Sequence, residues 1–246
     1  MLLAIDTSTD TASLALAEDK TVLAELTWRS KQNHTTQLLP NLSQLFKLTE
    51  TNAKSLTAVI VAQGPGSFNG LRVGVSAAKG LAFSLGIPII GVNSLEVSAY
   101  QYAEAGLPVC AIFNAGRSEV ATSTYQKKYG KWQQLVKADI VTVEHLCKQT
   151  TKKTLFCGEF LPAVAAQITA LLKTKAVIPP QIPDFKRASF LLELGSQRLD
   201  AGNIDDAVTL QPIYLRRPPI GGTEKRIDGL ILSARGEVPC NFTGER

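Results

Sequence analysis

The order of the apolar segments in the first hundred residues limits the possible folds more than any other feature. Three strand-length segments come first, separated by short polar turns, at Leu2–Asp6, Ala12–Ala17 and Thr21–Thr27. The segments that follow are a helix at 34–48, a strand at 56–62, a helix at 71–85, a strand at 87–92 and a helix at 94–105. A strand meander followed by strand–helix units predicts a mixed sheet with helices on its faces. This order is that of an actin-like or ribonuclease-H-like half-domain.

The helix at 34–48 is predicted from a single apolar stripe. Its members are spaced as on one face of a helix: Leu38, Leu39, Leu42, Leu45 and Phe46. Pro40 fits this helix if it lies in the first turn, and it would kink the helix elsewhere.

The second half of the chain is predicted to be a degenerate copy of the same order of strands and helices. Its predicted strands are Val109–Phe113, Glu119–Tyr125, Trp132–Val136 and Leu155–Cys157, and its predicted helices lie around 143–150, 161–173 and 187–201. We therefore expect an N-terminal lobe at 1–106 and a C-terminal lobe at 107–217. The remainder, 218–246, is rich in Pro, Gly and charge, and we expect it to be a partly disordered tail.

The positive charge is concentrated in the second half. The chain has 26 Lys and Arg against 21 Asp and Glu, a net charge of +5. Residues 1–110 hold 7 basic and 8 acidic residues, and residues 111–246 hold the other 19 and 13. This excess suits a solvated basic surface, and it also suits a face that meets nucleic acid or an acidic partner.

Cysteine and histidine usage argues against a metalloenzyme. The four cysteines form no CxxC pair, and neither His34 nor His145 has a second ligand at helical spacing. His145 is expected on a helix surface, and His34 at a helix start or an interface. The apolar runs are too short for a bilayer, and the first residues lack the charged start of a signal peptide, so we expect a cytoplasmic protein without a membrane partner.

Asp6, Thr7 and Ser8 end the first strand and could form a nucleotide loop. In actin-like ATPases a strand–turn–strand of this kind surrounds the phosphates, with hydroxyls and backbone N–H groups as donors. An ordinary turn also favours Asp, Thr and Ser for local hydrogen bonds. Three residues alone do not separate these two interpretations.

The segment GPGSFNGLRVG at 64–74 joins a buried strand to a helix. It is neither a Walker loop nor a Rossmann fingerprint. Gly70, Gly74 and Ala78 follow at i, i+4 and i+8, which leaves a bare ridge along the helix. A bare ridge permits close helix packing, either inside the same domain or against a partner.

Three segments in this order and spacing carry a family resemblance: MLLAIDTSTDTASLAL, NHTTQLLP and GPGSFNGLRVG. They closely resemble the TsaB (YeaZ) family, the non-catalytic paralogue of the TsaD/Kae-type, glycoprotease-like family. The resemblance is strong over 1–110 and weaker over 111–217, where FNAGRSEV and PIYLR echo family segments. It implies an actin-like (ASKHA, ribonuclease-H-like) fold with two similar lobes, each a mixed sheet flanked by helices.

The resemblance also implies a function. TsaB-type proteins are scaffold or activating subunits without an active site, in the bacterial complex that makes threonylcarbamoyladenosine beside the tRNA anticodon. The catalytic TsaD and the ATPase TsaE are the implied partners, tRNA is reached indirectly through the complex, and no cofactor of its own is implied, although the complex could bind ATP. Helices at 34–47 and 71–85 would form the shared interface. The interface residues this predicts are His34, Leu38, Leu42, Gly70, Arg72, Gly74 and Ala78.

The comparison accounts for the absence of a metal motif. Catalytic relatives carry His-x-Glu-x-His where this chain reads Ser94-Leu95-Glu96-Val97-Ser98, and two serines cannot replace two imidazoles as transition-metal ligands. The chain also departs from the TsaB pattern. Asn69 stands where Thr is common, and Asn114 and Gly116 stand where the family usually has Asp and Arg.

Three other functions remain open from the sequence. An actin-like small-molecule kinase would need a second phosphate loop, and the second half offers only Gly158-Glu159. A metallopeptidase would need more histidines. A homodimeric interaction protein could use the same two helices, since a surface that packs on a paralogue can also pack on itself.

Overall fold

The first of two five-stranded sheets is built from the N-terminal strands of the chain. The structure, a computed structural model, describes residues 1–31, 33–180 and 188–216. The first sheet has the order β3-β2-β1-β4-β5. Its strands are β1 (Leu2–Asp6), β2 (Thr11–Glu18), β3 (Thr21–Arg29), β4 (Ala58–Gly64) and β5 (Ile89–Asn93). β1 to β3 pair antiparallel, whereas β4 and β5 run parallel to β1, so the sheet is mixed as predicted.

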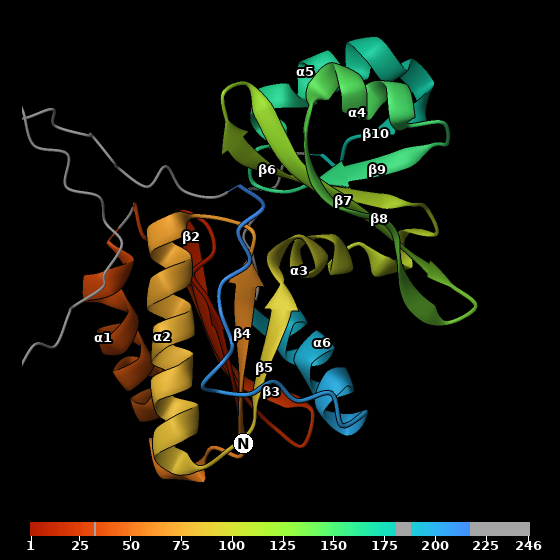
Figure 1. Ribbon diagram of the computed structural model, residues 1–246. Helices are drawn as coiled ribbons and strands as arrows, with labels where there is room; N and C mark the ends of the chain where they lie inside the picture. The colour runs from red at the N-terminus through yellow and green to blue at the C-terminus, as the bar shows by residue number, and fades with distance from the viewer. Residues whose placement is uncertain (32, 181–187, 217–246) are drawn as a thin grey trace, which may run out of the picture. The chain divides into compact units, whose positions relative to one another are not determined.

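Helices cover both faces of this sheet (Figure 1). α1 (His34–Leu48) and α2 (Phe68–Leu85) lie side by side on one face, where Leu38, Leu42, Val75 and Ala78 join the strand side chains in a common core. α6 (Ala188–Asp200) packs on the other face. α6 lies close to the sheet because Gly195 faces Ile60. A Cβ at Gly195 would lie 2.3 Å from Ile60 Cγ2.

The second sheet has the order β10-β9-β6-β7-β8. Its strands are β6 (Val109–Gly116), β7 (Glu119–Lys128), β8 (Lys131–Thr142), β9 (Thr154–Cys157) and β10 (Ala176–Val177). α4 (Val143–Gln149) and α5 (Leu161–Leu172) share a core with one face of the sheet. α3 (Ser94–Tyr100) packs against the other face through Leu95 and Ala99, and it also contacts β4 and β5 of the first sheet.

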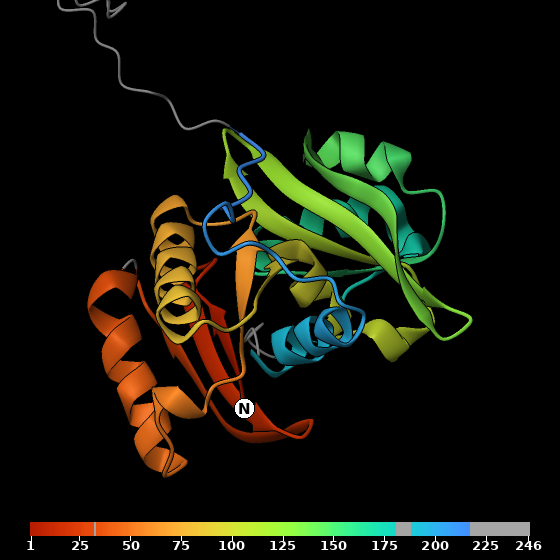
Figure 2. The ribbon, with the colours of Figure 1, turned by 60° about the horizontal axis from the view of Figure 1, so that its bottom comes forward.

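The segment 201–216 returns to the first sheet after α6 (Figure 2). Asp205 forms a bridge with Ile89 of β5, and the Ile213 N–H donates to Gln63 O of β4 at 2.8 Å. Lys79 Nζ of α2 donates to the carbonyls of Val208 and Leu210, each at 2.9 Å. Residues 201–216 therefore bind the edge of the first sheet and α2 together.

The actin-like prediction of two mixed sheets flanked by helices is confirmed, and three details differ. The helix expected at 187–201 forms, but it packs on the first sheet and not within the C-terminal lobe, because its apolar side chains face β1, β2, β4 and β5. The helix expected at 94–105 ends at Tyr100 and is followed by a short 3₁₀ turn, Ala103–Ala105. Pro40 lies inside α1, beyond its first turn. The expected tail, 218–246, lies outside the described residues.

None of the described helices combines the length and the apolar character needed to cross a membrane.

Candidate functional site

The predicted nucleotide loop, Asp6, Thr7 and Ser8, is buried. Each of the three residues is at most 1% exposed. Asp6 Oδ1 accepts hydrogen bonds from the Ser8 N–H at 2.9 Å and from Ser8 Oγ at 2.6 Å. The carboxylate thus stabilises the turn that follows β1, as the turn interpretation of the sequence requires.

The N-terminus of α2 covers this turn. Thr7 Oγ1 donates to Gly70 O at 2.7 Å, and the Ser67 N–H donates to Ser8 O at 2.7 Å. A Cβ at Gly70 would lie 2.1 Å from Thr7 O, and a Cβ at Gly74 would lie 2.2 Å from Thr7 Oγ1. The Thr7 and Ser8 hydroxyls, which could donate to phosphates in a nucleotide loop, donate here to Gly70 O and Asp6 Oδ1.

The bare ridge of Gly70, Gly74 and Ala78 therefore packs inside its own domain, and this corrects its prediction as partner interface. The other predicted interface residues on α1, His34, Leu38 and Leu42, are buried as well. His34 Nε2 forms a hydrogen bond of 2.8 Å with Thr9 O. The apolar stripe and the glycine ridge face the sheet because they supply the core, which leaves Arg72 as the one predicted interface residue that is exposed.

The outward surface of α1 and α2 presents a different set of residues, which we call the helix-pair face. It consists of Thr36, Leu39, Pro40, Ser43 and Lys47 of α1 and Asn69, Arg72, Ser76, Gly80 and Phe83 of α2, all exposed. Leu39 is 61% exposed and Phe83 is 75% exposed. Large apolar side chains this exposed, on two neighbouring helices, are typical of protein interaction sites.

Gly80 differs from the glycines of the ridge. No atom of the described residues, apart from the helix's own adjacent backbone, lies within 4 Å of the position that its Cβ would occupy. Sequence reasoning overlooked Gly80 because it followed the i+4 spacing from Gly70 and not the opposite side of the helix.

Aromatic contacts hold Arg72 in place at the start of α2. Its guanidinium lies 3.9 Å from the centroid of the Phe68 ring, and this ring lies 5.2 Å from that of Tyr214. Cation–π contacts of this kind fix the direction of an otherwise flexible side chain. Phe68 therefore orients Arg72 on the helix-pair face, and Tyr214 of the segment 201–216 packs against Phe68.

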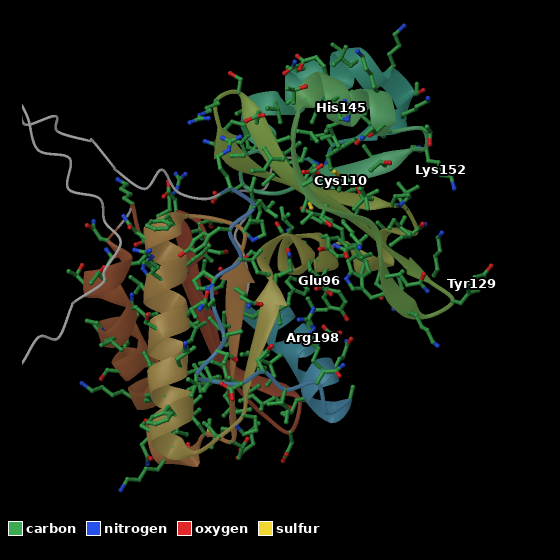
Figure 3. The ribbon with its side chains drawn as sticks, viewed as in Figure 1. Glu96, Cys110, Tyr129, His145, Lys152 and Arg198 are labelled. Atoms are coloured by element: carbon green, nitrogen blue, oxygen red, sulfur yellow. The ribbon has the colours of Figure 1, made fainter. Side chains whose placement is uncertain are left out.

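Glu96, in the segment 94–98 where we expected a lost metal motif, forms an ion pair with Arg198 (Figure 3). Glu96 Oε2 of α3 accepts from Arg198 Nη2 of α6 at 2.6 Å, and Arg198 Nη1 donates to Gly91 O at 2.6 Å. Ser94 Oγ accepts from the Gly64 N–H at 3.0 Å, and Ser98 is buried. Burial raises the pKa of Glu96 above its ordinary value, and Arg198 lowers it to a smaller extent. Among residues 1–31, 33–180 and 188–216, no group of three His, Cys, Asp or Glu side chains could hold a metal ion.

The two segments with the weaker family resemblance, 113–120 and 212–216, meet at the β6–β7 turn. Arg216 pairs with the Glu119 carboxylate and donates to Ala115 O at 3.2 Å. Arg117 is exposed at the turn, with a φ of 55°. Glu119 thus has a structural role, in tying the end of the segment 201–216 to the second sheet.

Comparison with known proteins relates these features to a family. The family model for TsaD, tRNA N6-adenosine threonylcarbamoyltransferase, matches residues 21–200. The Bacillus subtilis tRNA threonylcarbamoyladenosine biosynthesis protein TsaB is 35% identical over 218 residues, which cover 87% of this chain and 93% of that protein. This chain belongs to the TsaB family. The Escherichia coli TsaB protein is 28% identical over 226 residues, covering 87% of this chain and 94% of that protein.

A solved structure of a similar protein has the same fold as this chain. YeaZ from Pseudomonas aeruginosa superposes with a TM-score of 0.73 at 24% identity, over 86% of this chain and 99% of that one. The predicted TsaB (YeaZ) resemblance is confirmed by these matches.

We predict that Arg198→Met lowers the folding stability of this TsaB family member, and that the loss is largest at neutral pH. The substitution leaves the Glu96 carboxylate buried without its cation, and we expect a loss of roughly 2–3 kcal/mol in the free energy of unfolding, because Arg198 is partly exposed. Without Arg198 the pKa of Glu96 rises further. When the pKa of a carboxyl is raised in the folded state, the protein loses stability as pH rises through that pKa. The difference in unfolding free energy between Arg198→Met and the wild type should therefore shrink in mildly acidic buffer.

Urea unfolding at both pH values measures this effect, and Arg198→Met combined with Glu96→Gln is the control. The double variant should be more stable than Arg198→Met at neutral pH, and its deficit should depend less on pH. A deficit in Arg198→Met that is the same at both pH values would show that Glu96 is not the group responsible.

Proposed function

We propose that this chain is a non-catalytic scaffold or activating subunit of the machinery that makes threonylcarbamoyladenosine in tRNA. In this proposal it pairs with a TsaD-type transferase through the helix-pair face. The names of its relatives support the pathway, and the matching family model describes the transferase itself. A family in which catalytic and non-catalytic members share one fold is suited to paralogue pairing.

The single observation that carries the pairing is the open position at Gly80. Glycine inside a helix costs about 1 kcal/mol relative to alanine. Gly70 and Gly74 are required because a Cβ would collide with Thr7, whereas a Cβ at Gly80 would touch nothing in the described chain. A second protein whose helix approaches α2 closely would explain the glycine, since the absence of a side chain lets two helix backbones come together. Phe83, three residues further along α2, supplies an exposed apolar side chain beside it.

The absence of an active site is part of the proposal. Ser94 and Ser98 stand where catalytic relatives have metal-binding imidazoles, and Glu96 is held by Arg198. The loop of Asp6, Thr7 and Ser8 is closed by α2. We therefore assign ATP to the complex, with a TsaE-type ATPase as its third member, and no cofactor to this chain.

Titration of the isolated chain with ATP and Mg²⁺ tests this assignment. We expect no saturable heat of binding in calorimetry, because the Thr7 hydroxyl already donates to α2 and the Ser8 hydroxyl already donates to Asp6. Saturable binding that is lost on Asp6→Asn would contradict the assignment and favour an actin-like kinase. We assign the complex to the cytoplasm because its proposed substrate is tRNA; recovery of the chain outside the cytosolic fraction would contradict this.

Co-purification with the TsaD-type protein of the same organism tests the pairing. Gly80→Leu places a bulky side chain where we propose that a partner helix lies, so capture should fall at least about tenfold, equivalent to about 1.4 kcal/mol. Thr169→Leu adds the same side chain to an exposed site on α5 and is the matched control. The control should pair like the wild type, and both variants should keep the circular dichroism of the folded chain.

Two outcomes would count against this pairing. If folded Gly80→Leu is captured as well as the wild type, the helix-pair face is not the contact. If the wild type is not captured but dimerises on its own, and Gly80→Leu is monomeric, the face serves a homodimer and not a heterodimer.

A further inference from the structure

The basic charge of the chain belongs to the second sheet and its helices. Residues 107–180 hold 10 Lys and Arg against 4 Asp and Glu, a net charge of +6, whereas residues 1–106 hold 7 against 8, a net charge of −1. The helix-pair face lies in the acidic part. A second partner, of negative charge, is therefore suited to the other part of the chain.

Five exposed lysines gather near the C-terminal ends of α4 and α5, and we call them the lysine patch: Lys148, Lys152, Lys153, Lys173 and Lys175. Three of them line a hollow of about 470 Å³ together with the threonines at 150, 151 and 174. In the part of the chain that the structure describes, none of the five forms an ion pair. Glu144, the acidic residue one turn before Lys148, accepts a hydrogen bond from Gln167.

Helix dipoles explain only part of this patch. A lysine in the last turn of a helix stabilises the partial negative charge there, and the effect falls off beyond that turn. This accounts for Lys148 in the last turn of α4, and for Lys173 and Lys175 in the 3₁₀ turn that follows α5. Lys152 and Lys153 lie in the loop between α4 and β9, so the stability of the helices does not explain why they are basic.

An exposed aromatic ring stands at the tip of the β7–β8 hairpin. Tyr129 is 100% exposed, and Lys128 and Lys131 flank the turn. Tyr129 and Gly130 both have positive φ, 50° and 75°, a conformation that favours Asn followed by Gly and disfavours Tyr. Neither packing nor turn geometry therefore explains a tyrosine at this position.

The hairpin tip and the α4–β9 loop project to the same side of the second sheet in both ribbon views (Figures 1 and 2). Figure 3 shows Tyr129 and Lys152 on that side, both pointing away from the ribbon. One elongated ligand could therefore contact the lysine patch and Tyr129 together.

We propose that this side of the C-terminal lobe contacts a structured RNA directly. Lysine ammonium groups and threonine hydroxyls are typical donors to backbone phosphates; the lysine patch supplies the first, and the threonines of the adjoining hollow supply the second. An exposed tyrosine stacks on an unpaired base, which a loop or an end of the RNA provides. An acidic protein would use the lysines and leave the ring of Tyr129 unexplained. The inference rests on the proposed function, in which the substrate RNA is tRNA. It differs from our expectation from the sequence in that this chain contacts the tRNA directly and not only through the complex.

Fluorescence anisotropy with an unmodified tRNA transcript tests this proposal, on the full chain alone and paired with the TsaD-type protein. Lys152→Gln combined with Lys173→Gln should weaken binding and lower the slope of log K against log salt by about 1.5, because each lost phosphate contact contributes about 0.7–0.9. Lys31→Gln combined with Lys54→Gln removes the same charge from exposed sites in the acidic part and should leave the affinity within about twofold.

Tyr129→Asn separates stacking from charge. It should weaken tRNA binding about tenfold without changing the salt slope, and it should not weaken binding to a blunt RNA duplex, which offers no loop base to stack on. The variant should be at least as stable as the wild type, because Asn suits the turn better than Tyr.

Three results would overturn the proposal. The wild type could show no affinity for the transcript in either form, or the Lys31/Lys54 control could lose as much affinity as the patch variant. The patch variant could also keep full tRNA binding and lose association with the TsaE-type ATPase instead, which would make the partner an acidic protein. Capture by the transferase, measured on the same samples, shows whether the pairing still holds when the RNA inference fails.

Discussion

Three glycines, at 66, 70 and 74, let α2 lie against the turn after β1 at distances that no side chain would permit. A Cβ at any of them would lie 2.0–2.2 Å from an oxygen of Thr7 or Ser8. This contact fixes α2 on the first sheet and buries Asp6, Thr7 and Ser8. It also decides which side of α2 points outward, and so which residues form the helix-pair face. The burial of Asp6, Thr7 and Ser8 and the composition of the helix-pair face therefore have one physical origin.

The two sheets are joined by elements that contact both of them. α3 packs on the second sheet and also contacts β4 and β5, and its Glu96 is held by Arg198 of α6 on the first sheet. The segment 201–216 binds β4, β5 and α2 and then reaches the second sheet where Arg216 pairs with Glu119. Glu96 and Glu119 therefore act as structural connections between elements of the two sheets.

Much of this could be predicted from the sequence, because the signals were local. The meander at the start and the buried segments at 56–62 and 87–92 predicted every strand of the first sheet to within two residues at each end, and the apolar stripe predicted α1. The packing of α6 could not be predicted, because the pattern of an amphipathic helix does not determine which of two sheets its apolar face packs against. The glycine ridge was recognised as a close contact, but glycine spacing is the same for an internal and an external neighbour. Only the position of Thr7 against Gly70 and Gly74 separates the two.

The central claim is that the outward side of α2 is covered by a TsaD-type partner, and thiol accessibility measures this most directly. Ser76→Cys places a thiol on the helix-pair face, and Thr169→Cys places one on α5 as a reference. Cys240→Ser removes one native thiol, and Cys110, Cys147 and Cys157 are buried. We expect the transferase to slow maleimide labelling at position 76 at least about tenfold and to leave labelling at position 169 unchanged, because a buried interface core excludes reagent and water. Equal labelling of position 76 with and without a bound transferase would contradict the account.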